Sequence, residues 1–148
     1  MGHDSGDVQL PAGRTGEPGW SRQLPLPPSG HAAGLARQAA RDALAAWRLE
    51  AVSETAVLLV SELVTNAIRH ARTGGSAIVL TLETAGGWLR IEVHDGDPGG
   101  PVPRPLAGLE ESGFGLVLVD AMADKWGVRQ TASGKAVWVE LDTQPGLG

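Results

Sequence analysis

The stretch that most constrains the fold is residues 53–72, SETAVLLVSELVTNAIRHAR, because it carries the apolar repeat of an amphipathic helix. At about 100° per residue, the apolar side chains fall on one arc of such a helix. These are Ala56, Val60, Leu63, Val64, Ala67, Ile68 and Ala71. Ser61, Thr65 and Arg72 lie on the opposite side, and we expect them to face solvent. The segment therefore predicts a helix that packs on the core of a globular domain.

Three polar residues, Glu62, Asn66 and His70, follow each other at intervals of four along the border of this arc. Side chains four residues apart stand one above another on a helix, so the acid, the amide and the imidazole form one column. The spacing alone allows two interpretations. Either these residues merely edge an amphipathic helix, or a cleft meets the helix at this border.

Composition limits the class of protein to which this helix belongs. A length of 148 residues suits one domain. The formal net charge is −5 and no run is rich in Lys or Arg, so we expect no direct binding to nucleic acid. The absence of cysteine excludes disulfides, thiolate nucleophiles and cysteine-ligated zinc.

The sequence also predicts a cytoplasmic protein with no membrane segment. The first ten residues, MGHDSGDVQL, carry acids where a signal peptide has bases followed by an apolar stretch. The longest unbroken apolar run in the central helix, residues 56–60, is far too short to cross a bilayer.

The remaining segments predict one domain over residues 19–142, a disordered N-terminal tail over 1–18 and a short tail over 143–148. Helices are expected at 30–47, with Ser29 as N-cap, and at 113–126. Strands are expected at 20–26 (a short edge strand), 76–84, 88–95, 127–131 and 135–141. These elements predict an α/β (α+β) two-layer sandwich, with a mostly antiparallel mixed sheet covered by helices on one face.

Two glycine-containing stretches flank a long Gly/Pro segment, and such a segment inside a compact domain is usually functional. VHDGDPGG (93–100) ends a strand at Asp95, whose carboxylate can accept a hydrogen bond from an amino group. GFGLVLV (113–119) opens a helix on glycines, and free N–H groups at such a turn can hold phosphate oxygens. Each stretch alone also fits an ordinary turn.

Taken together and in this order, the three stretches resemble a known family. E-x-x-x-N-A-x-x-H on a helix, V-x-D-G-x-P-G at a strand end and G-x-G-L opening a helix are similar to the N, G1 and G2 boxes of GHKL ATPases. These proteins have the Bergerat ATP-binding fold. The compact length and the ending GKAVWVEL most resemble the small actinobacterial anti-sigma-factor serine/threonine kinases.

The resemblance, which covers roughly residues 20–142, implies a role for each matching residue. Glu62 would be the general base or position the attacking group, and Asn66 would hold the Mg²⁺ that bridges the ATP phosphates. Arg69 and His70 would contact phosphate and nucleoside, while Asp95 would accept from the adenine amino group. The other implied nucleotide-binding residues are Gly99, Gly113, Gly115 and Leu116.

Three residues depart from the family pattern. Asp97 stands where the G1 box has glycine, Phe114 stands where close relatives often carry arginine, and Lys135 replaces a threonine that helps to hold the adenine-binding acid. These departures leave two functions open. One is an ATP-dependent protein serine/threonine kinase that phosphorylates an anti-anti-sigma antagonist and binds a sigma factor when the antagonist is absent. The alternative is a non-catalytic, nucleotide-gated switch that binds its partner. A homodimer is compatible with both.

Overall fold

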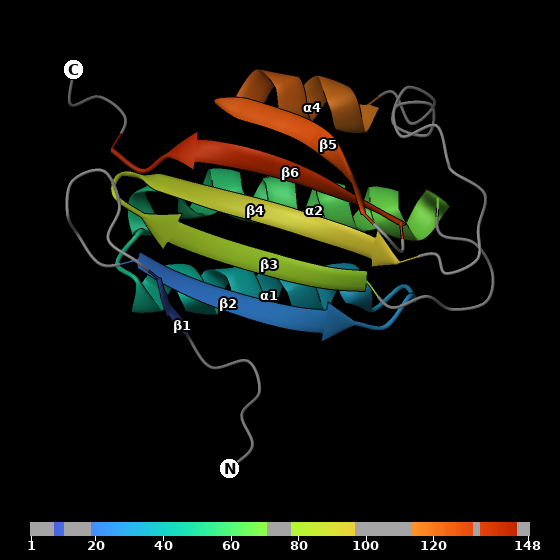
Figure 1. Cartoon of the computed structure of the whole chain (residues 1–148), viewed down its shortest axis with the longest axis horizontal. Coiled ribbons are helices and arrows are strands. Elements are labelled where there is room, and N and C mark those ends of the chain that lie inside the picture. The colour runs from blue at the N-terminus through green and yellow to red at the C-terminus, as the bar shows by residue number, and fades with distance from the viewer. Residues whose placement is uncertain (1–7, 11–18, 71–77, 97–113, 132–133, 145–148) are drawn as a thin grey trace, which may run out of the picture.

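The computed structural model describes residues 8–10, 19–70, 78–96, 114–131 and 134–144. They form a sheet with helices behind it (Figure 1). In chain order the elements are β1 (Val8–Leu10), β2 (Gly19–Leu26), α1 (Ala32–Ala46), a 3₁₀ turn (Glu50–Val52), α2 (Ser53–His70), β3 (Ile78–Ala85), β4 (Trp88–Gly96), α4 (Phe114–Met122), β5 (Lys125–Thr131) and β6 (Gly134–Asp142).

The sheet has six strands in the order β1-β2-β3-β4-β6-β5, and each neighbouring pair is antiparallel. α1 and α2 pack against each other and lie behind the sheet, while α4 packs against α2 and β5 (Figure 1). The predicted two-layer sandwich is therefore confirmed. Among the described strands no pair is parallel.

The apolar arc of α2 forms the centre of the core, as its periodicity predicts. Ala56, Val60, Leu63, Val64 and Ala67 are each at most 8% exposed, and they face the inward side of β3, β4 and β6. The buried part of the helix is wider than one arc, because α1 packs along a second side. The main difference from the sequence-based arc is a fully buried leucine, Leu59.

The expectation that Ser61 and Thr65 face solvent is wrong, since both are half-buried. Ser61 lies beside α1, where its Oγ accepts a hydrogen bond of 3.1 Å from Arg37 Nη1. A helix periodicity separates apolar from polar positions, but it does not reveal that a second helix will cover part of the polar side. Ala71 and Arg72 lie outside the described residues.

Several sequence-based boundaries also need correction. Val8–Leu10 pairs with β2, so this part of the predicted tail is a strand and β2 is not an edge strand. The helix predicted to run to residue 126 ends at Met122, and Trp126 lies in β5. The N-cap of α1 is His31, although Ser29 Oγ accepts from the His31 N–H at 3.3 Å. The rest of the predicted tails, 1–7, 11–18 and 145–148, lies outside the described residues.

The stretch Glu50–Arg69 is, by length and composition alone, apolar enough to cross a membrane, with a mean hydropathy of 1.4. Half of it is buried inside the protein, where it forms the core described above. Packing against β3, β4 and α1 accounts for its apolar character.

The sheet face turned away from α1 and α2 is organised around Trp138 of β6. Arg90 lies over the Trp138 ring at 4.4 Å from its centroid and forms an ion pair of 2.8 Å with Glu140. On β5, Gly127 lies opposite Trp138, and a Cβ there would be 2.8 Å from the indole Cζ2 atom. Any larger residue at this position would force the Trp138 ring to shift, because the ring lies directly against the backbone.

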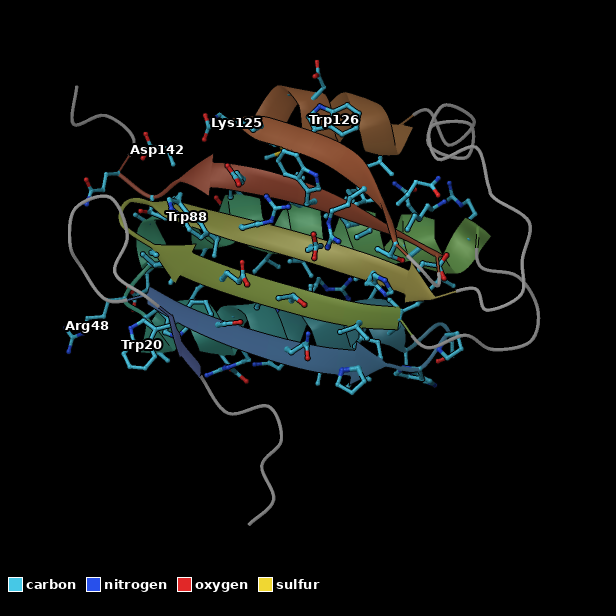
Figure 2. The ribbon with its side chains drawn as sticks, viewed as in Figure 1. Trp20, Arg48, Trp88, Lys125, Trp126 and Asp142 are labelled. Carbon is cyan, nitrogen blue, oxygen red and sulfur yellow. The ribbon has the colours of Figure 1, made fainter. Side chains whose placement is uncertain are left out.

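Helix α1 ends in a conformation that favours glycine. The Leu49 N–H donates to Leu44 O at 2.8 Å and the Arg48 N–H donates to Ala45 O at 3.2 Å, a Schellman pattern that places Arg48 at the left-handed position. Arg48 has φ 60° and an exposed side chain, labelled in Figure 2. A side chain in this region costs roughly 1–2 kcal/mol relative to right-handed backbone.

We therefore expect Arg48→Gly to raise the free energy of unfolding by up to about 1 kcal/mol. Glycine removes the left-handed strain, and the entropy that glycine adds to the unfolded chain cancels only part of this gain. Urea denaturation would measure the change. Arg41→Gly, at an exposed position inside the same helix, is the matched control and should destabilise by about 1 kcal/mol. A loss of stability in both variants would contradict strain at Arg48.

Candidate functional site

The three motif-bearing segments meet at one end of the molecule. The C-terminal ends of α2 and β4 and the N-terminal end of α4 lie on the right in Figure 1. β6 begins at the same end, and its register with β4 places Lys135 opposite Asp95 and Val137 opposite Val93. Residues that face each other across an antiparallel pair project from the same side of the sheet. All four side chains therefore share the face that α2 covers.

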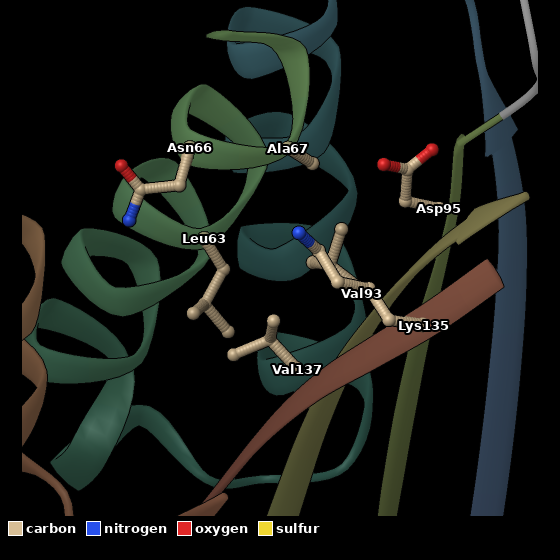
Figure 3. A pocket seen from close by; sticks show the side chains of 7 residues that line it. All are labelled: Leu63, Asn66, Ala67, Val93, Asp95, Lys135 and Val137. Carbon is tan, nitrogen blue, oxygen red and sulfur yellow. The ribbon is translucent and has the colours of Figure 1, made fainter. Parts of the chain in front are cut away.

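A pocket lies between this end of α2 and the two strands (Figure 3). Its walls are apolar on both sides, with Leu63 and Ala67 from α2 and Val93 and Val137 from the sheet. Asn66, Asp95 and Lys135 supply its polar groups. The cavity has a volume of about 10 Å³. All the atom-free space of the pocket, including the part open to solvent, is about 320 Å³. An apolar slot with a few convergent polar groups is the usual form of a site for a flat organic ligand.

Asn66 is the polar residue that α2 contributes to the pocket, and it is only 6% exposed. Its Nδ2 atom is buried and has no hydrogen-bond partner within the described ranges. A buried polar group without a partner costs roughly 1–3 kcal/mol, so a merely structural amide would be a poor choice for this core position. The arrangement favours an Asn66 that binds a ligand.

Asp95 stands at the end of β4, where the strand enters the Gly/Pro segment, and it is 7% exposed. Its Oδ1 atom is buried and accepts no hydrogen bond from the part of the chain that the structure describes, although the residue has another interaction. In Figure 3 this carboxylate and the Asn66 amide lie at opposite sides of the pocket. The two residues can therefore contact different parts of one elongated ligand.

Glu62 lies one helical turn before Asn66 on α2, where it is half-buried and outside the pocket lining. Arg69 is exposed. For His70 the structure describes the backbone, at the last position of α2, but not the side chain. The roles of these three residues remain predictions.

The glycine residues of the predicted site are only partly described. Gly115 and Leu116 belong to the first turn of α4, which packs against α2. Gly99, Gly113 and Asp97 lie outside the described residues.

Sequence reasoning missed the apolar walls of the pocket. Leu63, Ala67, Val93 and Val137 have the periodicity of ordinary core residues, so no feature of their own distinguishes them. One signal was available: apolar residues directly beside a predicted ligand-binding residue, such as Ala67 next to Asn66, are candidates for the wall of the same cleft.

Comparison with known proteins identifies the fold family. A model of the histidine kinase-like ATPase domain matches residues 26–141. The chain belongs to this family. It is thus a member of the GHKL superfamily, as the three motifs indicated. It is also similar to an uncharacterized protein of Streptomyces coelicolor, with 38% identity over 90 residues, which cover 60% of this chain and 86% of the relative.

Membership of this family supports ATP binding, usually with Mg²⁺. The residues of the pocket fit these ligands: the apolar walls suit a purine ring, Asp95 can accept from an amino group, and Nδ2 of Asn66 is a buried donor for an oxygen acceptor. The Oδ1 atom of the same amide is a hard neutral oxygen of the kind that Mg²⁺ prefers. Bound Mg²⁺ would neutralise phosphate charge.

If Asn66 holds Mg²⁺, Asn66→Ala should weaken ATP binding roughly tenfold or more in magnesium, because a hydrogen bond or ligand bond to a charged group is lost. In EDTA the same variant should differ much less from the wild type. Calorimetric titration in the two buffers measures both values.

Thr65→Ala, a neighbouring half-buried position of α2 outside the pocket lining, is the control for effects on the helix itself. An Asn66 that only edges the core would change thermal stability equally in both buffers. It would also leave the magnesium dependence of ATP binding intact.

Proposed function

We propose that this protein is an ATP-dependent serine/threonine protein kinase of the anti-sigma-factor type. In this proposal it acts in the cytoplasm, phosphorylates an anti-anti-sigma antagonist and binds a sigma factor when the antagonist is absent. ATP is the phosphate donor. A homodimer is compatible with this function and is not required by it.

The observation that carries the proposal is the position of Glu62, one turn before the buried Asn66 on α2. A carboxylate at this distance along the helix is close to the pocket without lining it. Because Glu62 is only half-buried, a second protein can reach its carboxylate while Asn66 lines the nucleotide pocket. Half-burial limits the directions from which a partner can reach it.

The proposed chemistry needs few groups from this chain. The serine oxygen of the antagonist would form a bond to the γ-phosphorus, the bond to the bridging oxygen would break, and ADP would leave. Glu62 would take the proton of the serine hydroxyl, as a general base does. Asp95 and the apolar walls would hold the adenine end, which fixes the position of the triphosphate relative to the acceptor.

The alternative is a non-catalytic, nucleotide-gated switch that binds its protein partner. It is favoured by Lys135, which lies in the pocket in place of a threonine. In this function Glu62 has no role in proton transfer, and nucleotide binding changes only the affinity for the partner.

Incubation with γ-labelled ATP and candidate antagonists encoded beside this protein tests the proposal. The kinase should transfer label to a serine or threonine of one antagonist and thereby release it from the complex. ATP binding without transfer to any antagonist would overturn the kinase and support the switch. A wild-type protein that binds no ATP would contradict the nucleotide site itself.

A further inference from the structure

We propose that Lys135, together with Asp95, recognises the adenine base of the nucleotide. Its ammonium would donate a hydrogen bond to one of the two ring nitrogens that flank the adenine amino group, N1 or N7. This inference rests on the proposed ATP-binding function and adds a specificity-determining residue to it.

The register of the sheet brings Lys135 to the pocket. It lies directly opposite Asp95 in the β4–β6 pair, and both side chains line the pocket. Directly opposite residues have Cβ atoms roughly 4.5–5.5 Å apart, so the two side chains share one part of the site. In Figure 3 the Lys135 chain extends across the pocket, and its nitrogen lies between the Asn66 amide and the Asp95 carboxylate in that view.

The environment of the ammonium points to a ligand from outside the described chain. Lys135 is half-buried, yet within the described ranges no ion pair or hydrogen bond to its side chain is found. A Lys ammonium has three donors and no acceptor. The stem of Lys135 is covered, while its nitrogen is not among the fully buried polar atoms and stays open to water in the pocket. The buried Nδ2 of Asn66 lines the same pocket without a partner within the described ranges, so the pocket presents two donors to an entering ligand.

The pair of groups complements one edge of adenine. Adenine presents an amino donor with a ring-nitrogen acceptor on either side, N7 in the major groove and N1 on the pairing edge. The Asp95 carboxylate would accept from the amino group, and the Lys135 ammonium beside it would donate to the neighbouring ring nitrogen. The cavity of about 10 Å³ is too small for a purine as it stands, so an entering base must displace lining side chains, and Lys135 is the long flexible one among them.

Lys135→Met is the informative variant, because methionine keeps the length and apolar stem while it removes the donor and the charge. We expect it to weaken binding of Mg·ATP roughly tenfold or more, the usual effect of losing a charged hydrogen bond. Displacement of a fluorescent ATP analogue measures the affinities. Thermal melting checks that the fold is intact.

The matched control is Lys125→Met, since Lys125 is the other lysine of the chain. It is exposed on β5 and pairs with Glu140, five positions along β6 from Lys135 (Figure 2). Binding of ATP to this variant should equal that of the wild type.

Two analogues identify the contact, one with N1 and one with N7 replaced by C–H. The analogue that lacks the nitrogen contacted by Lys135 should bind the wild type about tenfold more weakly than ATP does. In Lys135→Met the same replacement should weaken binding less than about twofold. If Lys135→Met weakens the binding of ATP and of both analogues by the same factor, the ammonium contacts the phosphates. The proposed contact with the base is then overturned. Equal ATP binding by wild type and Lys135→Met also overturns it.

Amine acylation followed by mass spectrometry gives a second measurement on unaltered protein. ATP should protect Lys135 and leave Lys125 reactive, whereas unprotected Lys135 in the ATP-saturated protein would contradict the contact. A wild type that binds no ATP in the displacement assay would refute the nucleotide site itself. If the wild type binds ATP and neither the substitution nor the protection experiment shows an effect at Lys135, only this inference is refuted.

Discussion

Asp95→Asn is expected to weaken ATP binding roughly ten- to a hundredfold and to leave the fold intact. The amide presents a donor where the carboxylate offers an acceptor, so the adenine amino group meets another donor. Asn is nearly the same size as Asp, and the backbone pairing of residue 95 with Ile78 and Lys135 does not involve the side chain. The loss should therefore fall on binding and not on stability.

Calorimetry with Mg·ATP measures this change, and thermal melting measures the fold. Asp42→Asn is a suitable control, because Asp42 is exposed on α1 and its carboxylate accepts a hydrogen bond of 2.9 Å from Gln38 Nε2 of the same helix. Unchanged affinity in Asp95→Asn would remove this residue from the adenine site. A large drop in melting temperature without ligand would instead assign Asp95 a structural role.

The long helix α2 and the β3–β4 hairpin were predictable because local sequence determines them. The 3.6-residue repeat predicted the arc of α2 that faces the sheet, and Gly86 and Gly87 have φ 50° and 95°, as a two-residue hairpin turn requires. Asn66 and Asp95 were singled out on other local grounds: Asn66 belongs to a polar column on the border of the apolar arc of α2, and Asp95 ends a strand where the Gly/Pro segment begins. Both are indeed buried and line one pocket.

Other features depend on contacts between distant segments, and local pattern could not supply them. Trp126 follows α4 after only Ala123, Asp124 and Lys125, but it belongs to a strand because β6 provides a pairing partner. β1 has three residues and exists only by pairing with the edge of β2. Lys135 is similar: the sequence marks it as a departure from the family pattern, but only the β4–β6 register places it opposite Asp95.

Glu62→Gln separates the proposed kinase from the switch. A general base contributes typically about 10²–10⁴-fold to rate and little to ground-state binding. Gln keeps the size and much of the hydrogen bonding of Glu, but it cannot take a proton. Since Glu62 lies outside the pocket lining, the variant should bind Mg·ATP about as well as the wild type.

Phosphate transfer from ATP to the antagonist should fall at least roughly a hundredfold in Glu62→Gln if Glu62 takes the serine proton during that step. The complex with the antagonist should also persist longer, because phosphorylation would no longer release it. Glu54→Gln, an exposed position in the first turn of the same helix, is the control. If the wild type transfers phosphate and Glu62→Gln does so equally fast, the kinase stands and Glu62 is not its base. If the wild type binds ATP but transfers phosphate to no antagonist, the protein is the nucleotide-gated switch.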